Sequence, residues 1–296
     1  MPHSALKWVY LVVLSIIWGS SFILIKKGLI GLSPLQLGSL RILFTAFFLL
    51  LIGAKSLKKV KRPAWKWLII SGFLGTFFPA FLFSFAETEI DSAIAAILNS
   101  SVPLLALIAG CLFFGASFIK RQLYGVLLGL VGATLLILIG ARINPDQNYW
   151  YALLVILAGV MYAFNVNIIK AHMQHISAMA IAVGNFIFLI IPAAIILFLT
   201  GFFNAETLQD TTVHTSLWYV VILALFGTAA AKVMFNKMVQ ISDPVFASSV
   251  TYLMPVVSVL WGLLDGEKFN LLQLGASVII IVGVYLVNKQ RKIPKS

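Results

Sequence analysis

The sequence predicts an all-α membrane protein with ten transmembrane helices, arranged as two inverted five-helix repeats whose N and C termini are both cytoplasmic. Three observations predict this fold: an extreme apolar composition, a series of apolar segments long enough to cross a bilayer, and an internal repeat. Hydrophobic residues occupy 61% of the 296 positions, charged residues occupy only 10%, and the mean hydropathy is +1.04. A water-soluble domain cannot bury that much apolar surface, so lipid must be the solvent for most of the chain.

Net charge and cysteine content narrow the class of protein further. A net charge of +12 in a soluble protein would suggest nucleic acid as a partner. Here the basic residues lie between apolar segments, which indicates membrane topology and no nucleic-acid partner. The single cysteine, Cys111, excludes an internal disulfide. The apolar run after Lys7 continues past Trp18 without a small-residue cleavage site, so we interpret it as a retained first span.

Ten segments are apolar over the roughly 20 residues that a helix needs to cross the hydrocarbon core. Ser33-Pro34 and Asp243-Pro244 each place a capping side chain before a proline at the first helical position, which marks the start of two of them. Asp91, which matches Asp243 in the repeat described below, is interpreted as a helix cap as well. The connections are short and leave no room for a soluble domain. The segments are residues 8–26, 34–53, 66–86, 91–114, 121–140, 149–169, 177–201, 216–238, 244–264 and 270–288.

Charged residues are distributed unevenly between the two membrane faces when the N-terminus is placed in the cytoplasm. Since cytoplasmic loops carry an excess of Lys and Arg, both termini are predicted to be cytoplasmic. The opposite face holds every acidic residue except Asp243, and its basic residues are Lys26, Lys27, Arg142 and Lys268. The cytoplasmic ends hold Lys7, Lys55, Lys58, Lys59, Lys61, Arg62, Lys66, Lys120, Arg121, Lys170, Lys237, Lys289, Arg291, Lys292 and Lys295.

The chain contains one sequence unit twice, in residues 1–140 and 141–296. Residues 91–103, DSAIAAILNSSVP, match residues 243–255, DPVFASSVTYLMP, with Asp, Ala and Pro at equivalent places. Each unit holds five predicted spans, an odd number, so the second unit enters the membrane inverted. Inverted repeats of this kind are typical of secondary transporters, whose cargo binds near the midplane between the halves. Further matches are Gly75-Thr76 with Gly227-Thr228 and Ile25-Lys26 with Ile169-Lys170.

Several motifs resemble those of one transporter family. Residues 15–22, SIIWGSSF, followed by Lys26, resemble the opening of EamA-type members of the drug/metabolite transporter superfamily, and Arg41 fits the same pattern. The resemblance covers nearly the whole chain. The two units also end alike, with Pro103, Gly115 and Gly132 in the first and Pro255, Gly266, Glu267 and Gly283 in the second.

This resemblance implies a multi-pass carrier of the bacterial inner (cytoplasmic) membrane, with a cavity formed by spans 1, 3, 4, 6, 8 and 9. Spans 5 and 10 would lie further from the cargo. Members of the family export amino acids, drugs or other metabolites, so the cargo stays open. One departure from this pattern is visible: the first unit has Ala116 where the second has Glu267, which we interpret as a helix cap.

Two basic residues lie within predicted spans. Lys232 shares one helix face with Thr228 and Asn236, and an ionisable group at such depth usually faces a cavity. The alternative is that Lys232 extends toward the cytoplasmic end of its helix. If it faces the cavity, Lys232 is also a possible site of proton coupling. Arg41 lies in the second span, which the resemblance keeps away from the cavity, so we expect a structural role for it.

No Asp or Glu lies deep in any predicted span. A carrier of lipophilic cations generally needs a buried carboxylate, whereas Lys232 and Arg41 could both meet the carboxylate of a cargo molecule. The charge pattern therefore favours an anionic or zwitterionic cargo.

Both repeats contain a helix broken by proline near the membrane midplane. A proline frees the carbonyl one turn earlier, so Pro103 and Pro255 are predicted structural residues that expose backbone acceptors beside polar side chains. These groups suit the ammonium and carboxylate of an amino acid, although hydrogen bonding between helices is the alternative role. The polar side chains are Asn99, Ser100 and Ser101 in the first repeat, and Ser248, Ser249, Thr251 and Tyr252 in the second; among them, Asn99 and Tyr252 are the expected cavity residues.

Aromatic residues provide a candidate apolar wall. Trp18 and Phe22 share a face of the first span, and Tyr162 and Asn165 stand at equivalent positions of the sixth. Phe77 of the third span is a further candidate, and Asn165 is an additional polar candidate. Aromatic rings at this depth lie too far from the interface for the aromatic belt, so they either contact the cargo or pack against other helices.

The remaining motifs indicate packing and no chemistry. Gly125, Gly129 and Gly132 line the fifth span, which predicts close packing against the tenth span or a second subunit, so both a monomer and a homodimer stay open. His172 and His175 lack a carboxylate or cysteine partner, so no metal or other cofactor is expected. No catalytic motif occurs, so an enzyme is not expected.

The sequence therefore predicts a secondary transporter that exports small metabolites, with amino acids as the favoured cargo, through alternating access to a midplane site in the lipid bilayer. Alternatives are a multidrug or nucleotide/sugar-type carrier on the same scaffold, or a non-transporting receptor or scaffold. The predicted substrate-binding residues are Lys232, Asn99, Tyr252, Trp18, Phe22, Phe77, Thr228 and Asn165.

Overall fold

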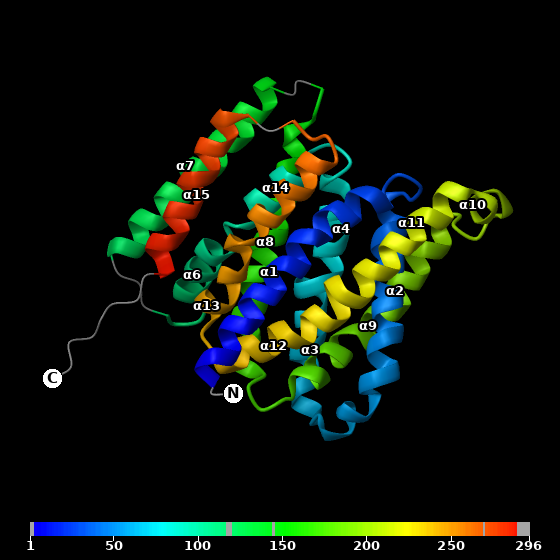
Figure 1. Cartoon of the computed structure of the whole chain (residues 1–296). Coiled ribbons are helices and arrows are strands. Elements are labelled where there is room, and N and C mark those ends of the chain that lie inside the picture. Colours follow the sequence, from blue (N-terminus) through cyan, green and yellow to red (C-terminus); the bar gives the residue numbers. More distant parts are fainter. Residues whose placement is uncertain (1–2, 117–119, 144–145, 269, 289–296) are drawn as a thin grey trace.

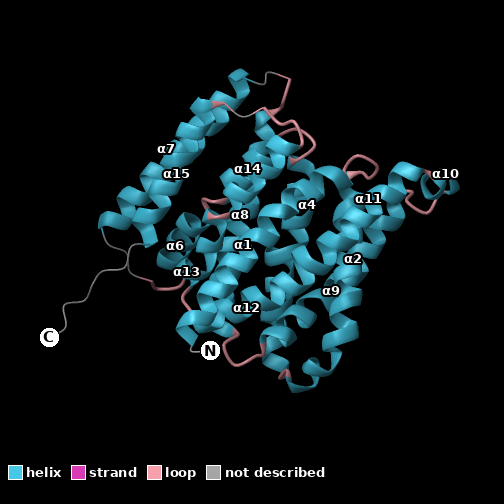
Figure 2. Ribbon diagram, viewed as in Figure 1, coloured by secondary structure: helices cyan, strands magenta, loops and turns pink. Residues whose placement is uncertain are grey.

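The computed structural model describes residues 3–116, 120–143, 146–268 and 270–288, and within these ranges every regular element is a helix (Figures 1 and 2). The first half contains α1 (His3–Gly28), α2 (Pro34–Gly53), η1 (Ala54–Lys59), η2 (Arg62–Ala64), α3 (Trp65–Gly72), η3 (Phe73–Phe77), α4 (Phe78–Ala86), α5 (Ser92–Asn99), α6 (Val102–Phe113) and α7 (Lys120–Ile143). The second half contains η4 (Tyr149–Tyr151), α8 (Ala152–His172), α9 (Ala178–Leu199), α10 (Ala205–Gln209), α11 (Thr211–Ile222), η5 (Leu223–Ala230), α12 (Ala231–Ile241), α13 (Pro244–Ser248), η6 (Ser249–Tyr252), α14 (Met254–Leu264) and α15 (Leu271–Asn288).

Eight helical segments in the described ranges are long and apolar enough to cross a membrane. They coincide with eight of the ten segments expected from the sequence. The other two expected segments fall on α7 and α15, whose apolar parts, Leu127–Leu136 and Leu271–Gly283, are shorter. The protein is therefore an all-helical membrane protein with multiple spans. The C-terminal basic residues counted above, Lys289, Arg291, Lys292 and Lys295, lie outside the described residues.

Helix starts follow the capping signals of the sequence at two of three sites. Ser33 forms a capping box with Gln36, and the Asp243 carboxylate accepts the Phe246 backbone N–H at 2.8 Å, as expected. Asp91 precedes α5 but makes no capping hydrogen bond, so its expected role as a cap is wrong. The N-terminus of α5 receives a carboxylate from the other half of the chain instead, which is Glu267.

Two spans change helix type in the middle. The segments η3 and η5 are π-helical turns that interrupt otherwise α-helical spans, α3 to α4 and α11 to α12. They hold the repeated pairs Gly75-Thr76 and Gly227-Thr228, so the distortion occurs at equivalent positions of both repeats. π turns often mark functional sites, because they disturb the regular ladder of backbone hydrogen bonds.

The fourth and ninth spans are broken, as the prolines predict. Helix α5 ends before Ser100, and Pro103 lies in the first turn of α6. In the second half, the 3₁₀ turn η6 separates α13 from α14, and Pro255 lies in the first turn of α14. Both breaks bring polar side chains and helix ends into the middle of the bundle.

Helices α7 and α15 pair with each other at one edge of the bundle (Figure 1). A Cβ atom built on Gly283 would lie 2.6 Å from the backbone oxygen of Gly125, and one on Gly132 would lie 2.8 Å from Ile280. Only glycine allows this approach. The small residues of the fifth span therefore pack against the tenth span, which was one of the two partners expected from the sequence, the other being a second subunit.

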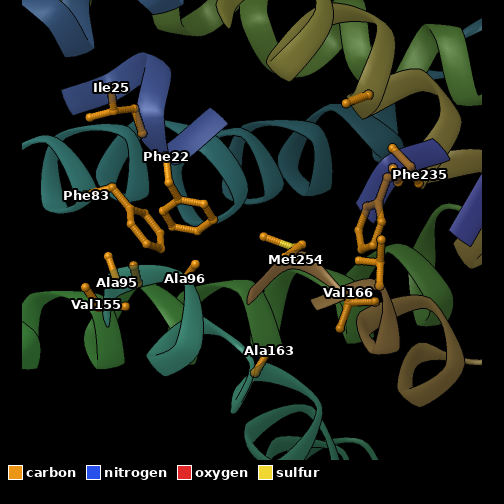
Figure 3. Close-up of a cluster of buried hydrophobic side chains, with 14 of the residues drawn as sticks. Phe22, Ile25, Phe83, Ala95, Ala96, Val155, Ala163, Val166, Phe235 and Met254 are labelled. Carbon is orange, nitrogen blue, oxygen red and sulfur yellow. The ribbon is translucent and has the colours of Figure 1, made fainter. Parts of the chain in front are cut away.

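Buried hydrophobic side chains form two clusters. The larger one surrounds the middle of the bundle, where Phe22, Phe83, Phe235 and Met254 converge from four spans (Figure 3). The smaller one lies among α2, the η3–α4 segment and α9, and it includes Phe77 and Phe81. The centre of the bundle is thus built largely from apolar side chains, and buried polar side chains such as Asn99, Thr228 and Lys232 enter it from several spans.

Candidate functional site

A cavity of about 100 Å³ lies in the middle of the bundle. Spans 1, 3, 4, 6, 8 and 9 line it, as the family resemblance implies, and the second span adds one residue, Arg41. No side chain of α7, α9 or α15 in the described part of the chain contributes to the wall. The polar residues of this wall come from the π turns, the helix breaks, the two basic side chains, and from α1 and α8, which contribute Ser21, Tyr162 and Asn165.

Lys232 reaches into this cavity from the first turn of α12. Its side chain is 7% exposed, and its ammonium donates a hydrogen bond to the backbone oxygen of Gly75 in η3. The ammonium is therefore directed across the interior to another span and not along its own helix toward the helix end. Thr228 lies one turn earlier on the same face and also lines the cavity, whereas Asn236 is buried outside it.

Arg41 also lines the cavity, at a position where the sequence suggested a structural role. Its Nε atom donates to the Thr228 hydroxyl at 2.9 Å, and that hydroxyl donates in turn to the Leu223 backbone oxygen at 3.1 Å. The salt bridges of the described residues involve neither Arg41 nor Lys232. Neither basic side chain of the cavity wall therefore has a salt-bridge partner among the described residues.

The two π turns are held by equivalent bonds that cross between the halves of the chain. Lys232 of the second half binds the Gly75 carbonyl of the first. Trp18 of the first half donates from Nε1 to the Gly227 carbonyl of the second at 2.9 Å. The Trp18 ring also packs on Phe235, with ring centroids 5.1 Å apart. The repeated Gly-Thr pair was the only signal in the sequence for this arrangement.

Two buried oxygen atoms in the wall have no hydrogen-bond partner. They are Oδ1 of Asn99, on α5, and Oγ1 of Thr76, in η3. Asn165 lines the cavity as well, and its Oδ1 accepts from the Ser71 hydroxyl at 2.6 Å. A buried polar atom without a partner is costly, so Asn99 and Thr76 are suited to receive a hydrogen bond from a bound molecule.

The other predicted residues divide between the wall and the packing around it. Phe22 lines the cavity and contacts Phe83 edge-on, with centroids 5.7 Å apart. Phe77 lies away from the cavity among Phe73, Phe78 and Phe81, because the π turn changes which face of the helix points inward. Tyr252 is not part of the wall either.

The position of Tyr252 has a similar cause. In the 3₁₀ turn η6 the residues are spaced three per turn, and Val250 and Thr251 face the cavity in its place. Phe235 and Met254 complete the apolar wall and were not among the predicted residues.

A group of charged residues joins the two halves at one end of the bundle. Lys26 of α1 lies 2.9 Å from Asp265 and 2.9 Å from Glu267, and Lys27 pairs with Asp265. Glu267 also accepts from the Ser92 hydroxyl at 2.6 Å and from the Ser92 and Ala93 backbone N–H groups, each at 3.2 Å. We call these residues the outer latch, after the predicted topology. Burial raises the pKa of Asp265, but the hydrogen bonds from Lys26 and Lys27 outweigh it and hold the pKa below its ordinary value.

Comparison with known proteins identifies relatives over the whole bundle. The family described as "EamA-like transporter family" matches residues 6–138 and 149–289. The inner membrane transporter YedA of Escherichia coli (strain K12) is 28% identical over 279 residues, which cover 93% of this chain and 88% of YedA. A probable amino-acid metabolite efflux pump of Salmonella typhimurium is 25% identical and covers 92% of this chain and 91% of its own. A solved structure at 18% identity superposes with a TM-score of 0.68 over 96% of both chains and so shares the fold.

Proposed function

Because the chain belongs to the EamA-like transporter family, we propose that it exports amino acids or closely related metabolites across the bacterial inner membrane. It is a transporter and not an enzyme. In this proposal, ten spans form two inverted five-helix repeats, residues 1–140 and 141–296, and both termini lie in the cytoplasm. The halves rock around the central cavity, which opens to one side at a time. The relatives support export, since one of them is a probable amino-acid metabolite efflux pump.

The charge of the cavity wall is the observation that carries the cargo assignment. Arg41 and Lys232 line the wall without an ion-pair partner, and Asn99 and Thr76 each offer an unpartnered oxygen. A carboxylate bound to the two cations would place a neighbouring ammonium where those oxygens can accept from it. This is the pair of groups that every α-amino acid carries.

The apolar part of the wall suits the side chain of such a molecule. Phe22, Phe83, Phe235 and Met254 gather in the same cavity (Figure 3). Its volume of about 100 Å³ corresponds to several water-sized spaces and favours a small molecule over a large drug. A lipophilic cation is disfavoured, because the wall holds two cations and, among its described residues, no carboxylate.

The two crossed bonds at the π turns support alternating access. Each half holds a backbone carbonyl of the other, through Lys232 to Gly75 and through Trp18 to Gly227. Rocking of the halves must break or redirect these bonds. Cargo that binds Lys232 would weaken its bond to Gly75, so cargo binding and movement of the halves would be coupled.

The test is amino-acid exchange in proteoliposomes. Vesicles are loaded with unlabelled amino acids, labelled ones are added outside, and the wild type is compared with Lys232→Met. Loss of a hydrogen bond to a charged group costs about 1.5–3 kcal/mol, so exchange should fall about tenfold or more. Lys237→Met on the same helix, outside the cavity wall, is the matched control and should exchange normally.

Two results would change the proposal. Exchange that survives Lys232→Met would keep the amino-acid cargo and remove the lysine from the binding site. Wild-type protein that exchanges no amino acid would refute the cargo, and the same vesicles would then be tested with nucleotides, sugars and lipophilic drugs.

A further inference from the structure

A buried carboxylate lies beside the cavity, although no acid lies deep within any span. Glu87 directly follows the span that ends at Ala86, and the sequence alone placed it outside the membrane. Its side chain is 7% exposed, and neither carboxylate oxygen has a hydrogen-bond partner in the structure. It lies one helical turn beyond Phe83, which lines the cavity, so the two side chains leave the helix on the same side.

The charged groups near Glu87 form no hydrogen bond or salt bridge with it in the described structure. Lys26 on α1 is paired with Asp265 and Glu267, and Arg41 on α2 bonds Thr228 through its Nε atom. On α8, the nearby titratable group is Tyr162, which interacts with Arg41. The π turn η3 contains no titratable side chain. Glu267 adds a negative charge. Asp91, which follows in the same connection, interacts with Gln147, Glu267 and Lys26.

These surroundings favour the protonated form of Glu87. An ionised carboxylate that is buried and unpaired is strongly disfavoured, and such a group usually takes up a proton. Burial raises the pKa of Glu87 well above its usual range, and the charge of Glu267 raises it further. Arg41 and Lys26 oppose this rise but do not cancel it.

We propose that Glu87 is a proton-binding site that holds a proton while the outer latch is closed and releases it when the latch opens. Opening would separate Lys26 from Glu267, admit water, and leave Lys26 free to stabilise the ionised carboxylate. Proton release and opening are then linked, so each favours the other. The proposal rests on the alternating access proposed above, but it does not depend on which cargo is carried.

The direction of the pH effect follows from this linkage. The closed form binds the proton more tightly than the open form, so acid favours the closed latch and alkali favours the open one. A glutamine at this position resembles the protonated acid in shape and charge. Glu87→Gln should therefore keep the latch closed at every pH.

The proton itself is tested first, in purified protein without cargo. The infrared C=O absorption of a protonated carboxyl should be present at neutral pH, should disappear in Glu87→Gln, and should persist in Glu206→Gln. Glu206 is the matched control because it is exposed on α10. If wild type and both variants give the same carboxyl absorption, the proposal is refuted whatever the cargo is.

The link to opening is tested by thiol labelling from outside the vesicle, in a Cys111→Ser background. Ile25→Cys reports the buried wall of α1, and Ile30→Cys, at 66% exposure, corrects for the pH dependence of the thiol itself. Corrected labelling of Ile25→Cys should rise about tenfold from about pH 6 to about pH 8. Adding Glu87→Gln should leave it slow and flat, with normal unfolding temperature as proof of folding. A rise that survives Glu87→Gln would show that another group controls opening.

Discussion

The two ends of the bundle are built from the same repeat but are held by different interactions. Lys26 and Lys170 are equivalent in the repeat, yet Lys26 pairs with two carboxylates across the halves, whereas the hydrogen bond of Lys170 within the described residues goes to the Ser242 backbone oxygen, at 2.6 Å. The difference traces to two residues, because Asp265 and Glu267 at the outer end correspond to Phe114 and Ala116 at the other. The repeat sets where the halves meet, and single side chains set how strongly they hold.

The backbone around these two positions is alike, which makes the comparison a clean one. Glu267 and Ala116 each follow a glycine with positive φ, Gly266 at 84° and Gly115 at 69°. In both turns the following N–H donates to a carbonyl near the end of the preceding helix, Glu267 to Gly262 at 2.9 Å and Ala116 to Gly110 at 3.0 Å. Only the side chain differs.

Removing Glu267 should have the largest effect. Glu267→Ala leaves Lys26 without its buried partner and the start of α5 without its cap, and removing one member of a buried pair costs about 3 kcal/mol or more. The unfolding temperature in detergent should drop clearly, and Ile25→Cys should label faster from outside. Glu89→Ala, in a nearby connection but outside the latch, is the control. An unchanged unfolding temperature would mean that the latch contributes nothing.

Strong acid, below about pH 4, should weaken the outer end before the other end, whereas the proton on Glu87 favours the closed latch at milder pH. The pKa of Asp265 is below its ordinary value, so its contribution is present above the unfolded pKa of about 3.9 and is lost as the pH falls through the folded value. Limited proteolysis should cut the connections beside the latch at this acidity, while those beside Ser242 stay resistant. Equal cleavage at both ends would contradict the comparison.

Adding the missing acid should make the two ends more alike. Ala116→Glu places a carboxylate in the turn of the first half that is equivalent to the turn of Glu267. Lys170, the equivalent of Lys26, is the intended partner of this carboxylate. We expect a gain of about 1 kcal/mol for a partly buried charged pair. Exchange in proteoliposomes should slow, because the cytoplasmic end becomes harder to open. Ala116→Gln separates charge from size, and faster exchange in Ala116→Glu would argue against the idea.

Neutralising Lys170 should have the smallest effect. Lys170→Met removes a hydrogen bond from an ammonium to a carbonyl, which is partly exposed and worth about 1 kcal/mol. Lys26→Met should cost more, since it breaks two ion pairs. The unfolding temperatures of the two variants, measured side by side, compare the strengths of the two ends directly. A larger drop for Lys170→Met than for Lys26→Met would contradict the prediction that the outer end is held more strongly.

Span positions were well predicted from the sequence, because each depends on local signals. Helix α2 begins and ends where expected, since Ser33 and Pro34 mark its start. The breaks at Pro103 and Pro255 follow from proline chemistry alone. Lys232 was found because a charge within an apolar run is rare and conspicuous.

The residues placed incorrectly share a physical cause. Phe77 and Tyr252 were assigned to the cavity from their residue type and their place in a span, but they lie outside its wall, on a π turn and a 3₁₀ turn that change which side chains face inward. Apolar sequences do not reveal such turns. Glu87 was placed outside because it directly follows a span, and its burial cannot be read from that position because it depends on how the helices pack. Asp91 lost its expected role to a residue from the other half of the chain.

The pairing of α7 with α15 has a consequence for how the halves can move. One helix comes from each half, and at their closest approach the backbone of Gly283 meets that of Gly125 and Gly129. The side chain of Ile280 packs onto Gly132 in the same contact, so backbone and side chains together hold the two helices close. The pair stands at the edge of the bundle, away from the cavity (Figure 1). In the alternating access proposed above, this pair would act as a pivot that keeps the halves joined while the cavity opens to one side or the other.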